Sequence, residues 1–150
     1  MKVFVLDVDG VMTDGRMYYT SEGKMMKAFG ADDHDALTIL REYILIKFVT
    51  ADKIGFKITH KRIFEDMMFP LSLVKMKDRV DWMSQWDLRE VIYMGDGILD
   101  PPVFEKVGYS ICPADGFYLA KEKASFVTES GGGHRAVAEA CVHIKEKFFV

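Results

Sequence analysis

The chain has 150 residues, 49% of them hydrophobic, and a net charge of −3. This length predicts a single domain, 1–150, with a core of its own, and the charge excludes the strongly basic surface typical of partners of nucleic acid or anionic membranes. No apolar run approaches the ~20 residues of a transmembrane helix, and Cys112 and Cys141 are expected to be buried free thiols of a cytoplasmic protein.

The first predicted element is an apolar run, 3–8, that leads into two carboxylates, Asp7 and Asp9. Open α/β sheets bind their ligands at the carboxyl ends of the strands. Gly10 follows directly, so the chain can leave the strand after Asp9 and direct both acids into one site. Two crowded carboxylates favour a hard divalent cation such as Mg²⁺. The simpler alternative is a solvated acidic turn.

The next segment, 16–29, has a different character. Two short stretches rich in Met, Tyr and Lys flank Thr20-Ser21-Glu22-Gly23, a four-residue turn with its glycine last. This pattern predicts a β-hairpin inserted directly after the acidic motif.

Beyond the hairpin, segments of strand and helix character alternate. With the first run, the predicted strands are 3–8, 45–50, 91–95, 109–112 and 126–128. The predicted helices are 33–42, 54–67, 79–86, 101–107, 117–123 and 135–147. Short apolar strands separated by helices predict an α/β fold with a parallel sheet covered on both faces.

The strand at 45–50 ends in a hydroxyl residue, Thr50, and Ala51 and Asp52 lead into a helix expected near Lys53. A hydroxyl group and the free N–H groups of a helix start are suited to binding phosphate. The simpler interpretation is that Thr50 or Asp52 caps the helix.

A basic cluster, Lys75, Lys77 and Arg79, precedes the amphipathic helix at 79–86. A cation here would hold a phosphate and screen an acidic nucleophile. A solvated helix start fits the local sequence equally well.

The strand at 91–95 again ends in an acid, Asp96, which lies between Gly95 and Gly97. Asp100 either adds a second acid or caps the helix that begins at Pro101. The strand ends thus carry, in chain order, two acids, a hydroxyl, a cation and an acid. Together they predict a phosphate- and metal-binding site at one edge of the sheet. Response-regulator receivers use similar groups in another order, which disfavours that class.

The segment 7–15, Asp-Val-Asp-Gly-Val-Met-Thr-Asp-Gly, resembles the first motif of the haloacid dehalogenase (HAD) superfamily. It is most similar to the capless branch of 3-deoxy-D-manno-octulosonate 8-phosphate phosphatases, whose relatives act on nine-carbon sugar-acid phosphates. Supporting matches are 15–19, 27–29, Asp33, Thr50, Asp96, 113–115 and the glycines before the last helix. The resemblance implies a three-layer Rossmann-like fold with a central parallel sheet, an inserted hairpin and no large cap domain.

The resemblance also implies catalytic roles. Asp7 would be the nucleophile that forms an aspartyl-phosphate, and Asp9 the general acid and base. The cofactor Mg²⁺ would be held by Asp7, the backbone carbonyl of Asp9, and Asp96, with Asp100 as a further candidate.

Four positions would bind the phosphate group: Gly10, Thr50, Ala51 and Arg79. Arg79 stands where the family has a lysine, and it joins Thr50 among the catalytic residues. Lys77 and Lys75 remain alternatives because a small slip of register exchanges them.

The implied function is Mg²⁺-dependent hydrolysis of 3-deoxy-octulosonate 8-phosphate or a nonulosonate 9-phosphate, as in lipopolysaccharide or sialic acid biosynthesis. Three departures from the family pattern, Asp52, Gly97 and Ala138, motivate an alternative. In it the chain is a catalytically weakened domain that serves as an oligomerisation or regulatory module in those pathways.

In the family the hairpin builds a homotetramer in which a neighbouring subunit closes the pocket. The same role is expected of 16–29 here. The side chains expected to be exposed for it are Met17, Tyr18, Tyr19, Met25, Met26 and Phe29.

Overall fold

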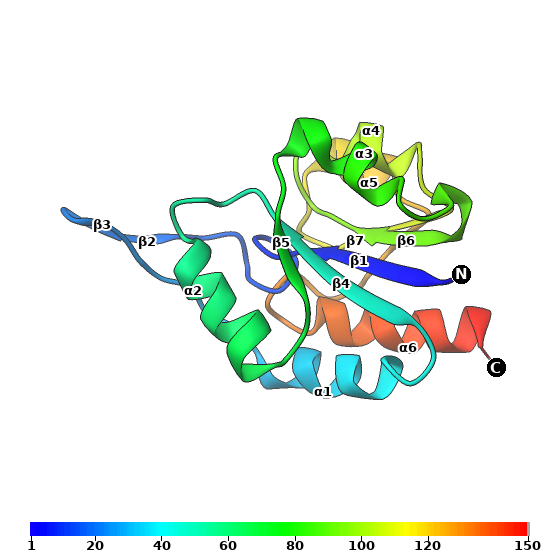
Figure 1. Ribbon diagram of the computed structural model, residues 1–150, viewed down its shortest axis with the longest axis horizontal. Helices are drawn as coiled ribbons and strands as arrows, with labels where there is room; N and C mark the ends of the chain where they lie inside the picture. Colours follow the sequence, from blue (N-terminus) through cyan, green and yellow to red (C-terminus); the bar gives the residue numbers. More distant parts are fainter. Residues whose placement is uncertain (150) are drawn as a thin grey trace.

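Six parallel strands form the centre of the molecule in the computed structural model, which describes residues 1–149 (Figure 1). They are β1 (Val3–Asp7), β4 (Leu45–Thr50), β5 (Leu71–Leu73), β6 (Val91–Met94), β7 (Tyr109–Cys112) and β8 (Phe126–Val127). Their order across the sheet is β5-β4-β1-β6-β7-β8. All five predicted strands of the sheet are confirmed, and β5 is an additional edge strand.

Helices cover both faces of this sheet, so the predicted three-layer α/β fold is confirmed (Figure 1). One face carries α1 (Ala31–Leu40) and α6 (Ala136–Phe148), and the other carries α3 (Arg79–Met83), α4 (Pro101–Phe104) and α5 (Tyr118–Lys123). The helix expected over 54–67 is divided into α2 (Phe56–His60) and a π-helical segment, Lys61–Asp66. Short 3-10 turns occupy Met76–Asp78 and Leu88–Glu90.

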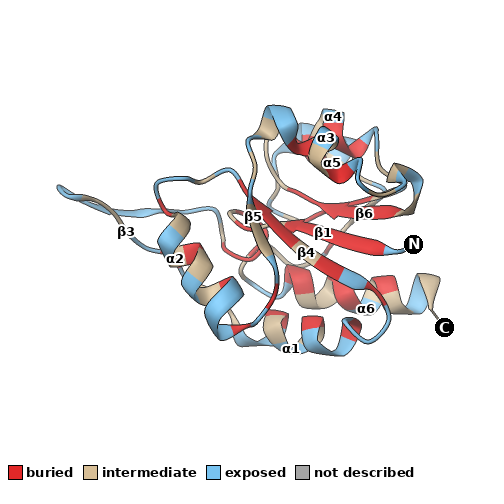
Figure 2. Ribbon diagram, viewed as in Figure 1, coloured by how far each residue is buried: buried red, intermediate tan, exposed pale blue. Residues whose placement is uncertain are grey.

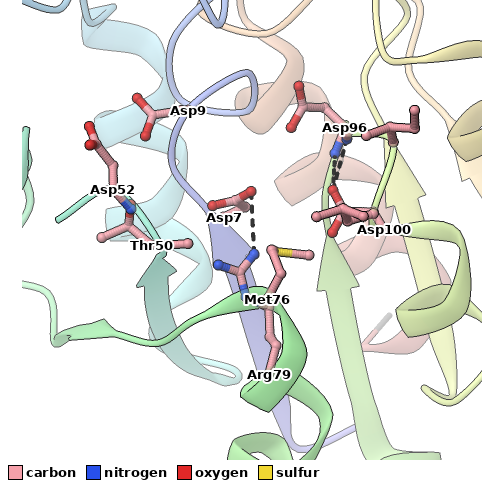
Figure 3. Close-up of a pocket in the computed structure, with 12 residues that line it drawn as sticks. Asp7, Asp9, Thr50, Asp52, Met76, Arg79, Asp96 and Asp100 are labelled. Carbon is pink, nitrogen blue, oxygen red and sulfur yellow. Dashed lines mark hydrogen bonds and ion pairs between the residues drawn. The ribbon is translucent and has the colours of Figure 1, made fainter. Parts of the chain in front are cut away.

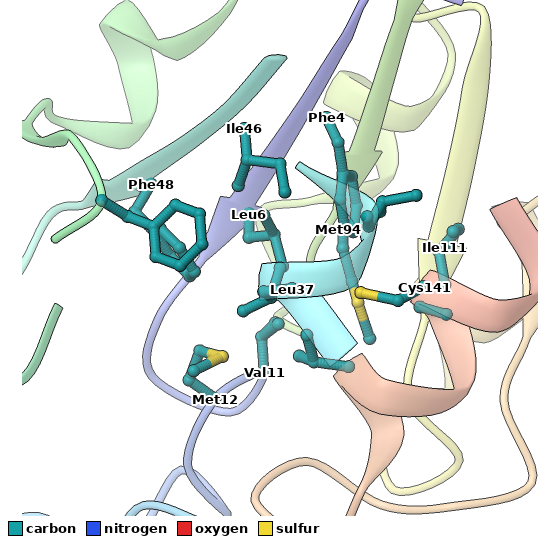
Figure 4. Packing of buried hydrophobic residues seen from close by; sticks show 14 of the residues in the cluster. Phe4, Leu6, Val11, Met12, Leu37, Ile46, Phe48, Met94, Ile111 and Cys141 are labelled. Atoms are coloured by element: carbon teal, nitrogen blue, oxygen red, sulfur yellow. The ribbon is translucent and has the colours of Figure 1, made fainter. Parts of the chain in front are cut away.

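The central strand β1 is buried on both faces, which explains its unbroken apolar sequence. Phe4 and Leu6 belong to the core under α1 and α6, which Figure 4 shows. Val3 and Val5 point to the opposite side and belong to the core under α3, α4 and α5. Figure 2 shows this burial running along the centre of the sheet.

The predicted hairpin is present as β2 (Tyr18–Thr20) and β3 (Gly23–Met26), an antiparallel pair that projects away from the sheet (Figure 1). Five of the side chains expected to be exposed are so: Met17, Tyr18, Tyr19, Met25 and Met26. The expectation for Phe29 is wrong. Phe29 lies past the end of β3, where the chain enters α1, and it packs against the core.

The strand order reverses at β1, and this places the candidate site. The chain passes from β1 to β4 and β5 on one side, and then to β6, β7 and β8 on the other. Ligands of open α/β sheets bind at such a switch point. Asp7 is the last residue of β1, Thr50 the last of β4, and Asp96 lies two residues past β6. No helix among residues 1–149 is both long and apolar enough to cross a lipid bilayer.

Candidate active site

A cavity of about 230 Å³ opens at the carboxyl edge of the sheet (Figure 3). It brings together residues from the ends of β1, β4 and β6 and from the start of α3. Seven of the predicted site residues line it: Asp7, Asp9, Thr50, Ala51, Arg79, Asp96 and Asp100. In Figure 3, Asp7 lies in the middle, with Asp9 on one side and Asp96 and Asp100 on the other.

Asp7 is paired with the buried guanidinium of Arg79. The Nη1 atom of Arg79 lies 3.4 Å from Asp7 Oδ2, while the backbone N–H of Val8 donates to Asp7 Oδ1 at 2.8 Å. Burial raises the pKa of Asp7 to about 7, although the charge of Arg79 opposes the rise. Ionised Asp7 is therefore a carboxylate whose charge is incompletely balanced by the protein alone.

Arg79 is itself fixed by a buried chain of hydrogen bonds. Its Nη1 donates to the hydroxyl of Tyr93 at 2.9 Å, and that hydroxyl donates to Asp100 Oδ1 at 2.7 Å. The other oxygen of Asp100 accepts the backbone N–H groups of Asp96 and Gly97 at 2.9 and 2.8 Å. Asp100 thus joins the cation on α3 to the loop that carries Asp96.

Three carboxylates converge beside the cavity in a way that suits a hard metal ion. Asp7, Asp96 and Asp100 each offer an oxygen, and these three atoms lie within 4.8 Å of one another. Burial, followed by the charges of Asp7 and Asp100, raises the pKa of Asp96 to about 8. Carboxylate oxygens are the ligands that Mg²⁺ prefers, and a divalent cation here would stabilise the ionised acids. The donor set therefore fits the predicted metal.

Gly10 lies within the turn after β1 and is not among the residues that line the cavity. Its backbone N–H donates to Thr13 Oγ1 at 3.1 Å, so this donor is already used within the turn and does not reach the cavity. Gly10 instead has a φ of +84°, and a side chain there would collide with the carboxylate of Asp96. Phosphate binding by Gly10 stays a prediction, and in the fold this glycine permits the close approach of the two loops.

The residues after β4 form a tight turn at the cavity. The hydroxyl oxygen of Thr50 accepts the backbone N–H of Asp52 at 3.1 Å, and Asp52 Oδ1 accepts the N–H of Gly55 at 3.0 Å. The helix expected near Lys53 begins only at Phe56. The capping interpretation is wrong, because the N-cap of α2 is Gly55 and no side chain caps the helix. Thr50, Ala51 and Asp52 instead line the cavity, and phosphate binding by Thr50 and Ala51 stays a prediction.

The three candidate cations of the basic cluster are placed differently. Arg79 is fully buried and lines the cavity, whereas Lys75 and Lys77 are exposed on the approach to α3. The arginine is therefore the member of the cluster that the fold brings to Asp7.

Two lysines of the hairpin segment enter the site, and the sequence did not indicate them. Lys27 Nζ lies 2.8 Å from Asp9 Oδ1, 2.8 Å from Asp52 Oδ2 and 2.8 Å from Thr59 Oγ1. Lys24 Nζ lies 2.6 Å from the same oxygen of Asp52. Burial would raise the pKa of Asp52, but hydrogen bonds from both lysines outweigh it and hold the pKa below its ordinary value.

The sequence carries little that would mark Lys24, Lys27 or Tyr93 as residues of the site. On a regular strand, residues three apart face opposite sides, so nothing placed Lys24 and Lys27 together. β3 ends at Met26, which frees Lys27 from that alternation. By its place in an apolar strand, Tyr93 fits an ordinary core residue of β6. A buried tyrosine hydroxyl nevertheless needs a hydrogen-bond partner, which is the one signal it offered.

The sequence matches the profile of haloacid dehalogenase-like hydrolases over residues 24–140. The chain is 32% identical to the 3-deoxy-D-manno-octulosonate 8-phosphate phosphatase KdsC of Salmonella typhi, across 94% of this chain and 77% of the relative. The same identity and coverage hold for KdsC of Escherichia coli K12. These relatives favour an enzyme over a module without turnover.

Solved structures agree with this assignment. The cobalt-bound deoxy-D-mannose-octulosonate 8-phosphate phosphatase of Haemophilus influenzae superposes with a TM-score of 0.87 at 27% identity, over 97% of this chain and 88% of that one. The phosphatase of Moraxella catarrhalis, solved with a magnesium ion, a phosphate ion and a KDO molecule, gives 0.83 at 26% identity, over 97% and 86%. By sequence and by fold, the chain belongs to the haloacid dehalogenase-like hydrolases and is a phosphoric monoester hydrolase of the KdsC-like type.

Proposed function

We propose that this protein hydrolyses the phosphate ester of a sugar acid, either 3-deoxy-octulosonate 8-phosphate or a nonulosonate 9-phosphate, with Mg²⁺ as its cofactor. The observation that carries the proposal is the meeting of Asp7, Asp9, Arg79 and Asp96 around one cavity. The names of the relatives point to the eight-carbon substrate. Residues 1–150 would form a single phosphatase domain with the hairpin inserted at 16–29.

Asp7 is the proposed nucleophile. One of its oxygens attacks phosphorus, the bond from phosphorus to the sugar oxygen breaks, and Asp9 donates a proton to that oxygen as it leaves. A water molecule then attacks the phosphorus of the aspartyl-phosphate, the bond from phosphorus to the Asp7 oxygen breaks, and the water gives a proton to Asp9. Inorganic phosphate leaves, Asp7 is again a carboxylate, and Asp9 is again protonated.

The groups around Asp7 would hold the phosphate during this reaction. Arg79 supplies a fixed positive charge next to the nucleophile, and Thr50 with the backbone of Ala51 faces the same cavity. Such positioned donors stabilise the charge that develops on the transferred phosphoryl group.

The proposed metal ligands are Asp7, the backbone carbonyl of Asp9, and Asp96. When bound, Mg²⁺ would shield the two anions from each other and offset the charge of the transition state. Both oxygens of Asp100 already accept hydrogen bonds. We therefore assign Asp100 mainly to the support of Asp96 and Arg79.

Assembly as a homotetramer through the segment 16–29 completes the proposal. The support is the row of apolar side chains that the projecting hairpin exposes, which is unusual for a monomer. A neighbouring subunit would then cover a cavity over which residues 1–149 place no cap domain. The two buried free thiols are consistent with the cytoplasm.

The direct test is a phosphate-release assay on a panel of eight- and nine-carbon keto-acid phosphates, with Mg²⁺ and with EDTA. We expect release from one member of the panel, only when the metal is present. Failure to release phosphate from every member would refute the proposed substrate class. Release that EDTA leaves unchanged would refute the metal requirement.

A further inference from the structure

Lys27 is a buried ammonium group with three acceptors around it. Its side chain has no exposed surface, and Nζ lies 2.8 Å from each of Asp9 Oδ1, Asp52 Oδ2 and Thr59 Oγ1. An ammonium group has three N–H donors and no acceptor. One hydrogen bond and two ion pairs within the protein therefore surround Nζ, and Lys27 faces these groups rather than a phosphate oxygen.

The contact of Lys27 with the proposed machinery is thus its bond to Asp9. Asp7 is fixed from two sides, by Arg79 and by the N–H of Val8. Asp9 lies past the end of β1, on the loop, where its side chain keeps 19% of its surface exposed. A carboxylate in that position needs an outside partner to keep one orientation, and the ion pair with Lys27 at 2.8 Å supplies it.

We propose that Lys27 is a positioning residue for proton transfer: it holds Asp9 by Oδ1 and so presents Oδ2 to the oxygen of the leaving group. This inference rests on the proposed role of Asp9. It adds a residue of the hairpin segment to the machinery, because Lys27 directly follows β3.

Asp52 and Lys24 extend the same network away from Asp9. Asp52 Oδ2 accepts from both lysines, and Lys24 reaches it at 2.6 Å without contacting Asp9. Lys24 therefore anchors the hairpin to the turn after β4, as Lys27 does, but lacks the bond that orients the carboxylate. The chain thus provides its own matched control.

The test compares Lys27→Met with Lys24→Met on two esters, the sugar-acid 8-phosphate and p-nitrophenyl phosphate. The sugar alkoxide needs a proton in order to leave, whereas p-nitrophenolate leaves without one. The parameter to compare is kcat/KM, because it covers only the steps up to the first irreversible phosphoryl transfer. A correctly placed general acid contributes about 10²-fold or more.

We expect Lys27→Met to lower kcat/KM about 10²-fold for the sugar ester, mainly through kcat, and less than about threefold for the aryl ester. Lys24→Met should keep the wild-type ratio of the two esters. Lys27→Arg, which keeps the charge, should recover part of the loss. Lys27→Gln replaces Lys27→Met if the latter fails to fold, with the same selective loss expected.

Equal losses on both esters, or no loss on either, would overturn the positioning role. So would a loss of equal selectivity in Lys24→Met. A wild-type protein that hydrolyses neither ester would instead refute the proposed function, and the positioning role with it.

Discussion

The acids of the cavity differ in how the protein balances their charges. Asp7 has Arg79 as its cation, and Asp9 has Lys27. Asp96 has no such partner among residues 1–149, and the charges that shift its pKa most are those of other carboxylates. Asp96 therefore lacks a positive charge beside it, and the metal that is proposed to bind there would supply one.

The hydroxyl of Tyr93 supports this arrangement, and its removal should be costly. Tyr93→Phe leaves Asp100 Oδ1 without its buried hydrogen-bond donor, and it leaves Arg79 Nη1 with only the longer contact to Asp7 Oδ2 at 3.4 Å. We expect the free energy of unfolding to fall by about 1–3 kcal/mol, as measured by urea denaturation in EDTA, together with a lower kcat.

Tyr109→Phe is the matched control. Its hydroxyl lies 2.9 Å from His143 Nε2, and neither residue lines the cavity, because Tyr109 stands at the start of β7 rather than at its carboxyl end. Tyr109→Phe should lower the free energy of unfolding by no more than about 1.5 kcal/mol and leave kcat unchanged. Equal effects of the two variants on kcat would contradict the account of Tyr93.

Gly97 is one of the departures from the family pattern, and the structure leaves room for an acidic side chain there. A Cβ atom at Gly97 would lie 3.5 Å from Asp100 Oδ2, an ordinary contact distance. Since charge count sets the affinity for divalent ions, Gly97→Asp should lower the Mg²⁺ concentration for half-maximal activity about tenfold. Gly97→Asn controls for size. An identical response of both variants would show that charge is not the cause.

At the residue scale, the sequence predicted the groups that stand at strand ends. Asp7, Thr50, Arg79 and Asp96 line one cavity because parallel strands present their carboxyl ends at the same edge. Lys27 could not be predicted, because its partners Asp9 and Asp52 lie far from it in sequence and only the fold brings them together.

At the element scale, the strands were predicted better than the helix ends. Buried parallel strands are continuous apolar runs, and 45–50 and 109–112 match β4 and β7 to the residue. β5 was missed because it is a three-residue edge strand that is only partly buried. The change from α2 to a π-helical segment leaves no periodic signal in a range this short.

The hairpin should carry the proposed assembly. Tyr19 is 62% exposed and Met25 51% exposed on β2 and β3. We expect the double variant Tyr19→Lys, Met25→Lys to sediment as a monomer, because charges on that surface oppose its burial. Val142→Lys, on an exposed position of α6, should keep the wild-type sedimentation. A wild-type monomer in analytical ultracentrifugation would contradict the proposed tetramer.

At the scale of the whole molecule, the buried acids predict how stability depends on pH without metal. The pKa of Asp7 is raised to about 7 and that of Asp96 to about 8, from an ordinary value of 3.8. At pH values between the ordinary pKa of 3.8 and the raised pKa of each acid, the folded state keeps a proton that the unfolded state has released. The free energy of unfolding should therefore fall as the pH rises from about 4 to 8. Asp52 acts oppositely, but only below its ordinary pKa.

Thermal unfolding in EDTA between pH 5 and pH 8 measures this effect. For a chain of this size, 1 kcal/mol corresponds to about 2–4 °C in Tm, so a fall of several degrees is expected. Mg²⁺ should raise Tm most near pH 8, since the cation then takes the place of the protons that Asp7 and Asp96 have lost. A Tm in EDTA that stays level or rises across this range would contradict the electrostatic account of the site.

The central claim is that Asp7 carries the phosphoryl group. The most direct measurement is mass spectrometry of the protein after acid quenching during turnover, with peptide mapping of the adduct. We expect one phosphoryl group on the peptide that contains Asp7, and none in Asp7→Asn, whose turnover should fall by about 10³-fold or more. An adduct on another residue, or an Asp7→Asn variant with full activity, would contradict the account.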